Sequence, residues 1–259
     1  MSKTSIFITI RKDSSRLPEK AMRKILGRSV MELVISRAKI AKNVDSIIVC
    51  TSTRDVDDEI EDMALKCGVD VFRGSLLDKL ERWNGAAKKF GVDYIVTFDG
   101  DDLFTEPELL DLGAKQITEG VYDFIESPKG IIPGAFTYAF TSKALAKACE
   151  IKDTDNTEMM WTYFKDTGLF KTGTLKDVSP VFFSEKIRAT LDYPEDFEFF
   201  RNIFEHFKSV NNDVSLRKIV KYLDEHPEVA KINIRRQEEF LENQRKKTFL
   251  AIREEHTNE

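Results

Sequence analysis

Four short apolar runs, rich in β-branched residues, alternate with longer amphipathic stretches along the first hundred residues. Each run predicts a strand that is buried on both faces of a sheet. The predicted strands cover residues 6–10, 45–51, 69–72 and 94–98. Apolar residues at helical spacing fill the intervals and predict helices over residues 30–40, 56–66 and a stretch after residue 75. This alternation indicates parallel β-α-β units with right-handed crossovers, and therefore an α/β fold.

The rest of the chain is less regular. We predict strands over residues 123–126, 135–140 and 187–191, and helices around residues 156–161, 197–207 and 215–225. The helix after residue 191 is opened by Pro194, with Glu195 and Asp196 in its first turn. Residues 235–255 are highly charged and carry only a thin apolar stripe. That segment is predicted either as a helix that packs on a partner or as a frayed tail.

Cationic residues follow the first predicted strand directly. Residues 11–20 contain four cations, a proline and two hydroxyl side chains, Ser14 and Ser15. In an open α/β sheet this loop lies at the carboxyl edge of the strand, where ligands bind. This loop suits a polyphosphate, because arginine offers a forked set of donors, lysine a compact charge, and the hydroxyls and loop amides further donors. The alternative interpretation is a basic turn that is solvated and binds nothing. The loop is not a Walker P-loop, because it has no glycine before Gly27.

A cluster of carboxylates follows the strand predicted over residues 94–98. Asp99, Asp101 and Asp102 surround Gly100 at the sheet edge that also carries the cationic loop. Carboxylates at a strand end suit Mg²⁺, which takes oxygen ligands and commonly shares them with substrate phosphates. The alternative is an acidic turn that caps the helix predicted to begin near Pro107.

Composition narrows the class of protein. With 259 residues, 41% of them hydrophobic, the chain is long enough for one large α/β domain. The net charge of -5 argues against a nucleic-acid-binding surface. Three widely spaced cysteines fit no zinc spacing, so we expect reduced thiols and a cytoplasmic protein. We expect no membrane insertion, because no apolar run approaches the length needed to cross a bilayer.

The order of residues in the cationic loop resembles the signature of the cytidylyltransferases that activate acidic sugars. These are the synthetases of CMP-3-deoxy-octulosonate (KDO), the acylneuraminate cytidylyltransferases and the spore-coat polysaccharide biosynthesis proteins, whose loop runs Ala-Arg-x-x-Ser-x-Arg-Leu-Pro-x-Lys. Ile10 replaces the usual Ala here, and Glu19 replaces the usual Gly. The residues that match the signature are Arg11, Ser14, Arg16, Leu17, Pro18 and Lys20.

Two further stretches carry the resemblance. Gly100 and Asp101 match the Gly-Asp of the family, and residues 106–108 stand for its Asp-Pro-Glu. Residues 192–196 match its Asp-x-Pro-Glu-Asp, in which the first Asp joins the metal; Asp192 takes that place and Asp196 serves the fold. The resemblance spans residues 5 to about 205 and is weakest between residues 129 and 186, the part that chooses the acceptor.

The resemblance implies a Rossmann-like, three-layer nucleotidyltransferase fold with a largely parallel central sheet. It implies one domain over residues 1–232, with an acceptor and dimerisation segment at about 127–186, and a charged helix or tail over residues 233–259. A homodimer is expected. The aromatic residues of the strand 135–140 suit either a dimer interface or a buried strand.

The resemblance also implies a set of site residues. Arg11, Arg16 and Lys20 would hold the phosphates of CTP, while Asp101 and Asp192 would hold Mg²⁺. The remaining substrate contacts would come from Ser14, Ser15, Ser75 and Asp78 around the nucleotide, and from Lys129, Tyr138 and Glu158 on the acceptor side.

The implied activity is transfer of CMP from CTP to an acidic 2-keto-3-deoxy sugar for surface polysaccharide synthesis. The rival enzyme is a glycosyltransferase of the GT-A type, whose Asp-x-Asp motif is satisfied by Asp99, Gly100 and Asp101. A non-catalytic nucleotide-binding subunit is a third reading, because Ile10 and Glu19 depart from the signature.

Overall fold

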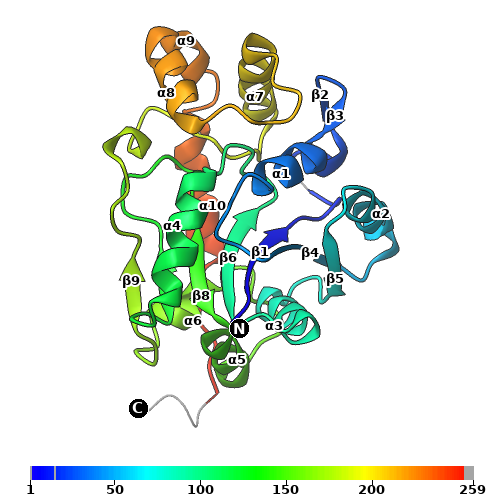
Figure 1. Ribbon diagram of the computed structural model, residues 1–259, viewed down its shortest axis with the longest axis vertical. Helices are drawn as coiled ribbons and strands as arrows, with labels where there is room; N and C mark the ends of the chain where they lie inside the picture. The colour runs from blue at the N-terminus through cyan, green and yellow to red at the C-terminus, as the bar shows by residue number, and fades with distance from the viewer. Residues whose placement is uncertain (1, 15, 254–259) are drawn as a thin grey trace.

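The computed structural model describes residues 2–14 and 16–253, which build a seven-stranded sheet between helices (Figure 1). The sheet strands are β1 (Thr4–Thr9), β4 (Ser46–Ser52), β5 (Asp70–Gly74), β6 (Tyr94–Asp99), β7 (Phe124–Glu126), β8 (Tyr138–Thr141) and β9 (Thr172–Thr174). A second, two-stranded sheet consists of β2 (Lys24–Ile25) and β3 (Arg28–Ser29).

The helices lie between and after these strands. The α-helices are α1 (Val30–Ala38), α2 (Asp58–Lys66), α3 (Lys79–Phe90), α4 (Pro107–Thr118), α5 (Ser142–Ile151), α6 (Trp161–Lys165), α7 (Pro194–Phe207), α8 (Leu216–Glu225), α9 (Pro227–Ala230) and α10 (Arg236–Lys247). The short 3-10 helices are η1 (Lys20–Met22), η2 (Asp55–Asp57) and η3 (Pro180–Phe182).

The strand order of the large sheet is β5-β4-β1-β6-β8-β7-β9. The first four strands of that order are mutually parallel, β8 runs antiparallel to both β6 and β7, and β9 is parallel to β7. The predicted parallel β-α-β units are therefore confirmed. They place the loops after β1 and β6 at the same edge of the sheet, because parallel neighbours end on the same side.

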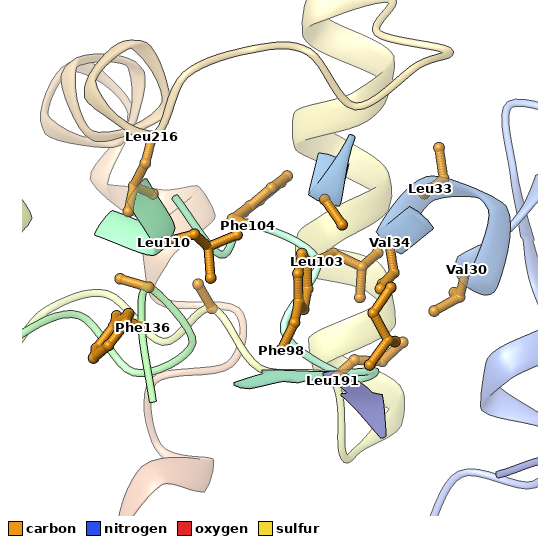
Figure 2. Close-up of a cluster of buried hydrophobic side chains, with 14 of the residues drawn as sticks. Val30, Leu33, Val34, Phe98, Leu103, Phe104, Leu110, Phe136, Leu191 and Leu216 are labelled. Carbon is orange, nitrogen blue, oxygen red and sulfur yellow. The ribbon is translucent and has the colours of Figure 1, made fainter. Parts of the chain in front are cut away.

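Both faces of the sheet are buried, as the apolar runs predicted. Along β1, Ile6 and Ile8 join the hydrophobic cluster that includes α1, α2, α4, α7 and α8, whereas Phe7 joins the cluster with α3, α5 and α6 (Figure 1). Figure 2 shows the first cluster, with Phe98 and Phe104 packed between α1 and α8. The period of two along a strand directs successive side chains into opposite layers and so builds three layers.

Two predicted elements differ in the structure. Residues 187–191 form no strand; they run as an extended segment whose Ala189 N–H donates to the Pro133 carbonyl at 3.0 Å. Leu191 N–H donates to the Asp101 carbonyl at 2.8 Å. The predicted strand was wrong because the partners of this segment are loops, which offer single hydrogen bonds and no ladder. The helix predicted around 156–161 begins only at Trp161.

The predicted strand 135–140 begins at Tyr138 in the structure, as β8, and Phe136 and Phe140 of this stretch face the protein interior. Phe136 and Phe140 are buried and Tyr138 is half-buried, so the buried-strand alternative accounts for them. The C-terminal segment takes the helical one of its two predicted forms, and this helix, α10, contacts this chain itself. Among the described residues, no helix combines the length and apolar character needed to cross a bilayer.

Glu19, which stands where the signature has glycine, lies in the left-handed backbone region at φ 53°. Its side chain is exposed and lies 3.5 Å from Lys12 Nζ. A residue other than glycine in this region costs roughly 1–2 kcal/mol of folded-state free energy. Replacing it by glycine removes this cost, but glycine also increases the conformational entropy of the unfolded chain and so offsets part of the stabilisation.

We expect Glu19→Gly to raise the free energy of unfolding by about 0.5–1 kcal/mol. Urea denaturation measures it. Glu19→Gln, which keeps the backbone strain, should change little; equal shifts in both variants would refute the strain.

Candidate active site

Three stretches distant in sequence meet at one edge of the sheet. The loop after β1 and the turn after β6 are adjacent because these strands are parallel neighbours, paired from Thr4 with Tyr94 to Thr9 with Asp99. The extended segment 187–191 joins them through its hydrogen bond from Leu191 to Asp101. One cationic and two anionic stretches are thereby brought together.

Lys20 is the centre of this junction. Its Nζ lies 2.7 Å from Asp101 Oδ2 and 3.5 Å from Asp192 Oδ1, and it donates to the Leu191 carbonyl at 3.0 Å. Arg16 donates from Nη2 to the same Asp192 Oδ1, and its guanidinium lies 5.3 Å from the ring centroid of Tyr193. The two cations and two carboxylates therefore face one point, as the signature implied.

Burial and charge act in opposite directions on these groups. Burial favours a raised pKa for Asp192, but Lys20, Arg16 and Arg188 outweigh it and hold the pKa below its usual value. Burial raises the pKa of Asp101, helped by the neighbouring Asp192 and Asp99 and opposed by Lys20. The pKa of Lys20 is raised, because the two carboxylates outweigh its burial. At neutral pH Asp192 is thus an anion and Lys20 a cation.

Gly100 permits the close approach of the first loop to the turn after β6. A Cβ at this position would lie 2.6 Å from Ile10 Cβ and 2.8 Å from the Thr9 carbonyl oxygen. Both contacts are shorter than a real Cβ allows, so a larger residue would separate the ends of β1 and β6. Glycine between the two aspartates is therefore a packing requirement of the site.

Arg188 lies behind Asp192 and is fully buried. Its Nη2 donates to Asp192 Oδ2 at 2.9 Å and its Nε donates to Asp196 Oδ1 at 3.0 Å. Asp196 also accepts the backbone N–H groups of Asp192 and Tyr193 at 2.8 and 2.9 Å, which confirms its role in the fold. This network fixes the carboxylate of Asp192, because both of its oxygens have charged partners.

Arg16, Lys20, Asp101 and Asp192 open onto a cleft with a volume of about 620 Å³. Arg11 enters it while donating to the Leu76 carbonyl at 2.8 Å and pairing with Glu158 at 3.1 Å. Glu158 therefore orients Arg11, whatever it also does for an acceptor. The predicted site residues that line the cleft are Arg11, Ser14, Arg16, Lys20, Asp101, Lys129, Tyr138, Glu158 and Asp192.

Comparison with known proteins agrees with the geometry. A family model described as cytidylyltransferase matches residues 6–246. The chain belongs to the cytidylyltransferase family. It is therefore a nucleotidyltransferase, and the resemblance carried by its first loop is confirmed.

Two relatives and one solved structure match this cytidylyltransferase along most of its length. The uncharacterized protein MJ1063 of Methanocaldococcus jannaschii is 33% identical and is matched over 95% of this chain and 98% of its own. The spore coat polysaccharide biosynthesis protein SpsF of Bacillus subtilis is 24% identical, over 89% and 98%. A cytidylyltransferase structure from Leptospira borgpetersenii superimposes with a TM-score of 0.80 at 25% identity, over 89% and 97%. The predicted Rossmann-like nucleotidyltransferase fold is confirmed.

Two predicted substrate residues of the cytidylyltransferase, Ser75 and Asp78, do not line the cleft. Asp78 is fully buried at the N-cap of α3, where it accepts from Glu81 N at 3.0 Å and pairs with Lys152. Ser75 accepts from Asp78 N at 3.1 Å and so stabilises the turn before α3. In the described part of the chain both lie outside the cleft lining, so we assign them to the fold. Ser15 lies outside the described residues.

Sequence reasoning missed a second ion pair on the cleft wall. Lys79 Nζ lies 3.1 Å from Asp99 Oδ1 and 4.7 Å from the ring centroid of Trp83. Its place in the first turn of α3 gave no signal, because a lysine there reads as a solvated charge. Asp102 is buried beside these groups, and burial, with Asp101 and Asp99, raises its pKa well above the usual value.

The carboxylates of the cytidylyltransferase fit a magnesium ion that is shared with phosphates. In the described residues no group of three or more His, Cys, Asp or Glu side chains is arranged to hold a metal by itself. Asp101 and Asp192 nevertheless converge on the single ammonium of Lys20. Mg²⁺ is commonly bound by one or two carboxylates, waters and substrate phosphates, and this donor set meets that requirement.

Proposed function

We propose that this cytidylyltransferase transfers CMP from CTP to an acidic 2-keto-3-deoxy sugar, of the KDO or nonulosonic acid kind, and releases pyrophosphate. The CMP-sugar would serve surface polysaccharide synthesis in the cytoplasm. The observation that carries the proposal is the convergence of Lys20 and Arg16 with Asp101 and Asp192 at the rim of one large cleft. The family assignment and the polysaccharide role in the name of the Bacillus relative support it.

The proposed step is an in-line displacement at phosphorus. The anomeric hydroxyl oxygen of the sugar forms a bond to the α-phosphorus, and the bond to the oxygen that bridges the α- and β-phosphorus breaks. Pyrophosphate leaves with the electron pair, and the hydroxyl proton passes to solvent or to a nearby base. Arg11, Arg16 and Lys20 would neutralise the negative charge that grows on the phosphate oxygens. This chemistry needs alignment and cations and no protein nucleophile, in agreement with the residues of the cleft.

Asp101 and Asp192 would hold Mg²⁺ together with the phosphates. The ion, when bound, supplies charge neutralisation to the phosphate oxygens. Lys20 would contact a phosphate oxygen at the same place, since its Nζ lies 2.7 Å from Asp101 and 3.5 Å from Asp192. Arg188 would keep Asp192 in place throughout, because it holds the other carboxylate oxygen.

Pyrophosphate release tests the proposed function. The protein is incubated with Mg²⁺, one of the four ribonucleoside triphosphates, and KDO, 8-amino-KDO or a nonulosonic acid. We expect pyrophosphate only with CTP and an acid acceptor, and we expect EDTA to abolish the reaction. Transfer or hydrolysis of a sugar nucleotide without CTP would favour the glycosyltransferase that Asp99, Gly100 and Asp101 suggested. Calorimetric binding of CTP without turnover on any acceptor would favour a silent homologue.

The proposed homodimer needs a separate measurement. Light scattering of the purified protein over a range of concentrations is expected to give twice the chain mass of 29.8 kDa. A constant mass of one chain would refute it.

A further inference from the structure

The C-terminal helix α10 forms one wall of the active-site cleft. Six of its residues line the cleft, and they recur at spacings of three and four along the helix. At 100° per residue they share one face, whereas residues 238, 239, 242, 245 and 246 share the other. The cleft-lining residues are Gln237, Phe240, Leu241, Asn243, Gln244 and Lys247.

The two faces of α10 differ in chemistry. All five residues of the outer face are charged, as expected for a solvated surface. The cleft face carries three amides, an aromatic ring, a leucine and one lysine, and it has no carboxylate. The helix, which the structure describes in full, has no buried residue, so this face does not serve the hydrophobic core.

Side-chain contacts hold α10 against the site. Arg188 Nη1 donates to Gln237 Oε1 at 2.7 Å, and Phe240 lies 4.7 Å from the Arg188 guanidinium and 5.7 Å from that of Arg16. Arg236 pairs with Glu195 at 2.9 Å and lowers the pKa of Glu195 to about 2. The wall is thereby tied to the two arginines that contact Asp192.

We propose that α10 is the acceptor-specificity wall of the cleft, with Lys247 binding the carboxylate of the acceptor and Gln244 binding its hydroxyls. This inference rests on the proposed function. Amides suit a polyhydroxylated sugar because each offers both a donor and an acceptor, while a single cation suits a single carboxylate. Phe240 and Leu241 provide an apolar surface for the C–H groups of a sugar ring.

The charges facing the cleft support an acidic acceptor. Lys129, on the loop after β7, lines the same cleft as Lys247. Within residues 2–14 and 16–253 neither ammonium has an ion-pair partner, in contrast to Arg16 and Lys20. The cations paired at the phosphate end are balanced by carboxylates. Lys129 and Lys247 keep their positive charge on the cleft wall, and an anionic acceptor would neutralise it.

The test compares Lys247→Ala with Lys246→Ala. Both lysines are exposed, both end the same helix, and only Lys247 lines the cleft. With CTP saturating, we expect Lys247→Ala to raise KM for the acid acceptor about tenfold and to leave KM for CTP within about twofold. Lys246→Ala should match the wild type, and Lys247→Arg should restore most of the affinity.

An uncharged acceptor separates a charge contact from a structural effect. The wild type should prefer the acid to its carboxamide analogue, and Lys247→Ala should lose this preference. Gln244→Ala should raise KM for both acceptors several-fold. Equal acceptor KM values for Lys247→Ala and Lys246→Ala would overturn the inference while leaving the proposed function intact. Absence of CTP-dependent pyrophosphate release from the wild type with every acid would overturn both.

Light scattering of the same variants tests whether a second copy of the chain, instead of the acceptor, covers the cleft face of α10. Should Lys247→Ala or Gln244→Ala convert a dimer into a monomer, the cleft face of α10 would be an interface with a second copy, and the inference would be wrong. We expect both variants to keep the mass of the wild type.

Discussion

Asp192→Asn is expected to lower kcat by about 10²–10³-fold, since charge stabilisation at a reacting phosphate contributes effects of this size. The variant keeps the shape of the side chain but removes the charge that faces Lys20, Arg16 and Arg188. Pyrophosphate release with saturating CTP and acceptor measures the effect. Asp99→Asn is the matched control, because Asp99 lines the same cleft but pairs with Lys79. Equal losses in the two variants would contradict the special role of Asp192.

The same substitution should also change the pH dependence of stability. Burial tends to raise the pKa of Asp192, but its three cationic partners lower it below 3.8. A carboxyl with a lowered pKa contributes stability above its unfolded pKa, and that contribution is lost as pH falls through the folded pKa. The wild type should therefore exceed Asp192→Asn in unfolding free energy near neutral pH, and the difference should shrink below about pH 4. A difference that does not vary with pH would refute the charge contribution.

Arg37→Met is expected to have the largest effect on stability, a loss of about 3–5 kcal/mol of unfolding free energy. Arg37, on α1, is buried and pairs with Glu106 at 3.1 Å. It also donates to the carbonyls of Thr105 and Val214 at 2.8 and 2.6 Å, and so joins α1 to the start of α4 and to the segment before α8. Burial lowers its pKa to about 10, so the side chain stays charged at neutral pH. Methionine would remove the charged partner of Glu106, which would keep only the backbone N–H of Leu216, and it would leave these carbonyls without the Arg37 donor.

Urea denaturation of Arg37→Met and Arg217→Met provides the comparison. Arg217 also pairs with a glutamate, Glu108, at 2.8 Å, but that pair is exposed and should contribute less than about 1 kcal/mol. The folded fraction of Arg37→Met should keep the wild-type kcat, because Arg37 lies outside the cleft lining in the described residues. Equal losses in the two variants would contradict the importance of burial.

Local patterns were enough to predict the parallel half of the sheet. Short apolar runs such as 6–10 are typical of buried strands, and the polar loop after each run marks the edge of the sheet where a site forms. Lys20, Asp101 and Asp192 each stand in a short motif at a strand end or a helix start, and the structure brings the three together at the cleft. Glycine at position 100 belongs to the same motif, and the structure adds its steric reason.

The other predictions failed where the outcome depends on contacts between distant segments. Asp78 stands in a matching segment, but its oxygens are occupied by α3 and Lys152. Residues 187–191 have the apolar character of a strand and lack a strand as neighbour. The cleft face of α10 has only a thin apolar stripe in the sequence, because its amides and one lysine carry no hydrophobic signal, although their spacing of three and four is present there.

The sequence by itself determined the family, the parallel β-α-β units and the charged residues of the phosphate end. These depend on residue type and on spacing within one strand, loop or helix, which short-range sterics and hydrophobic burial dictate. Only the tertiary structure decided which charges meet, that Arg188 supports Asp192 and that α10 closes the cleft. The pairings of Lys20 with Asp101, of Arg16 with Asp192 and of α10 with Arg188 join segments more than forty residues apart. Their free energy depends on the packing of the whole domain.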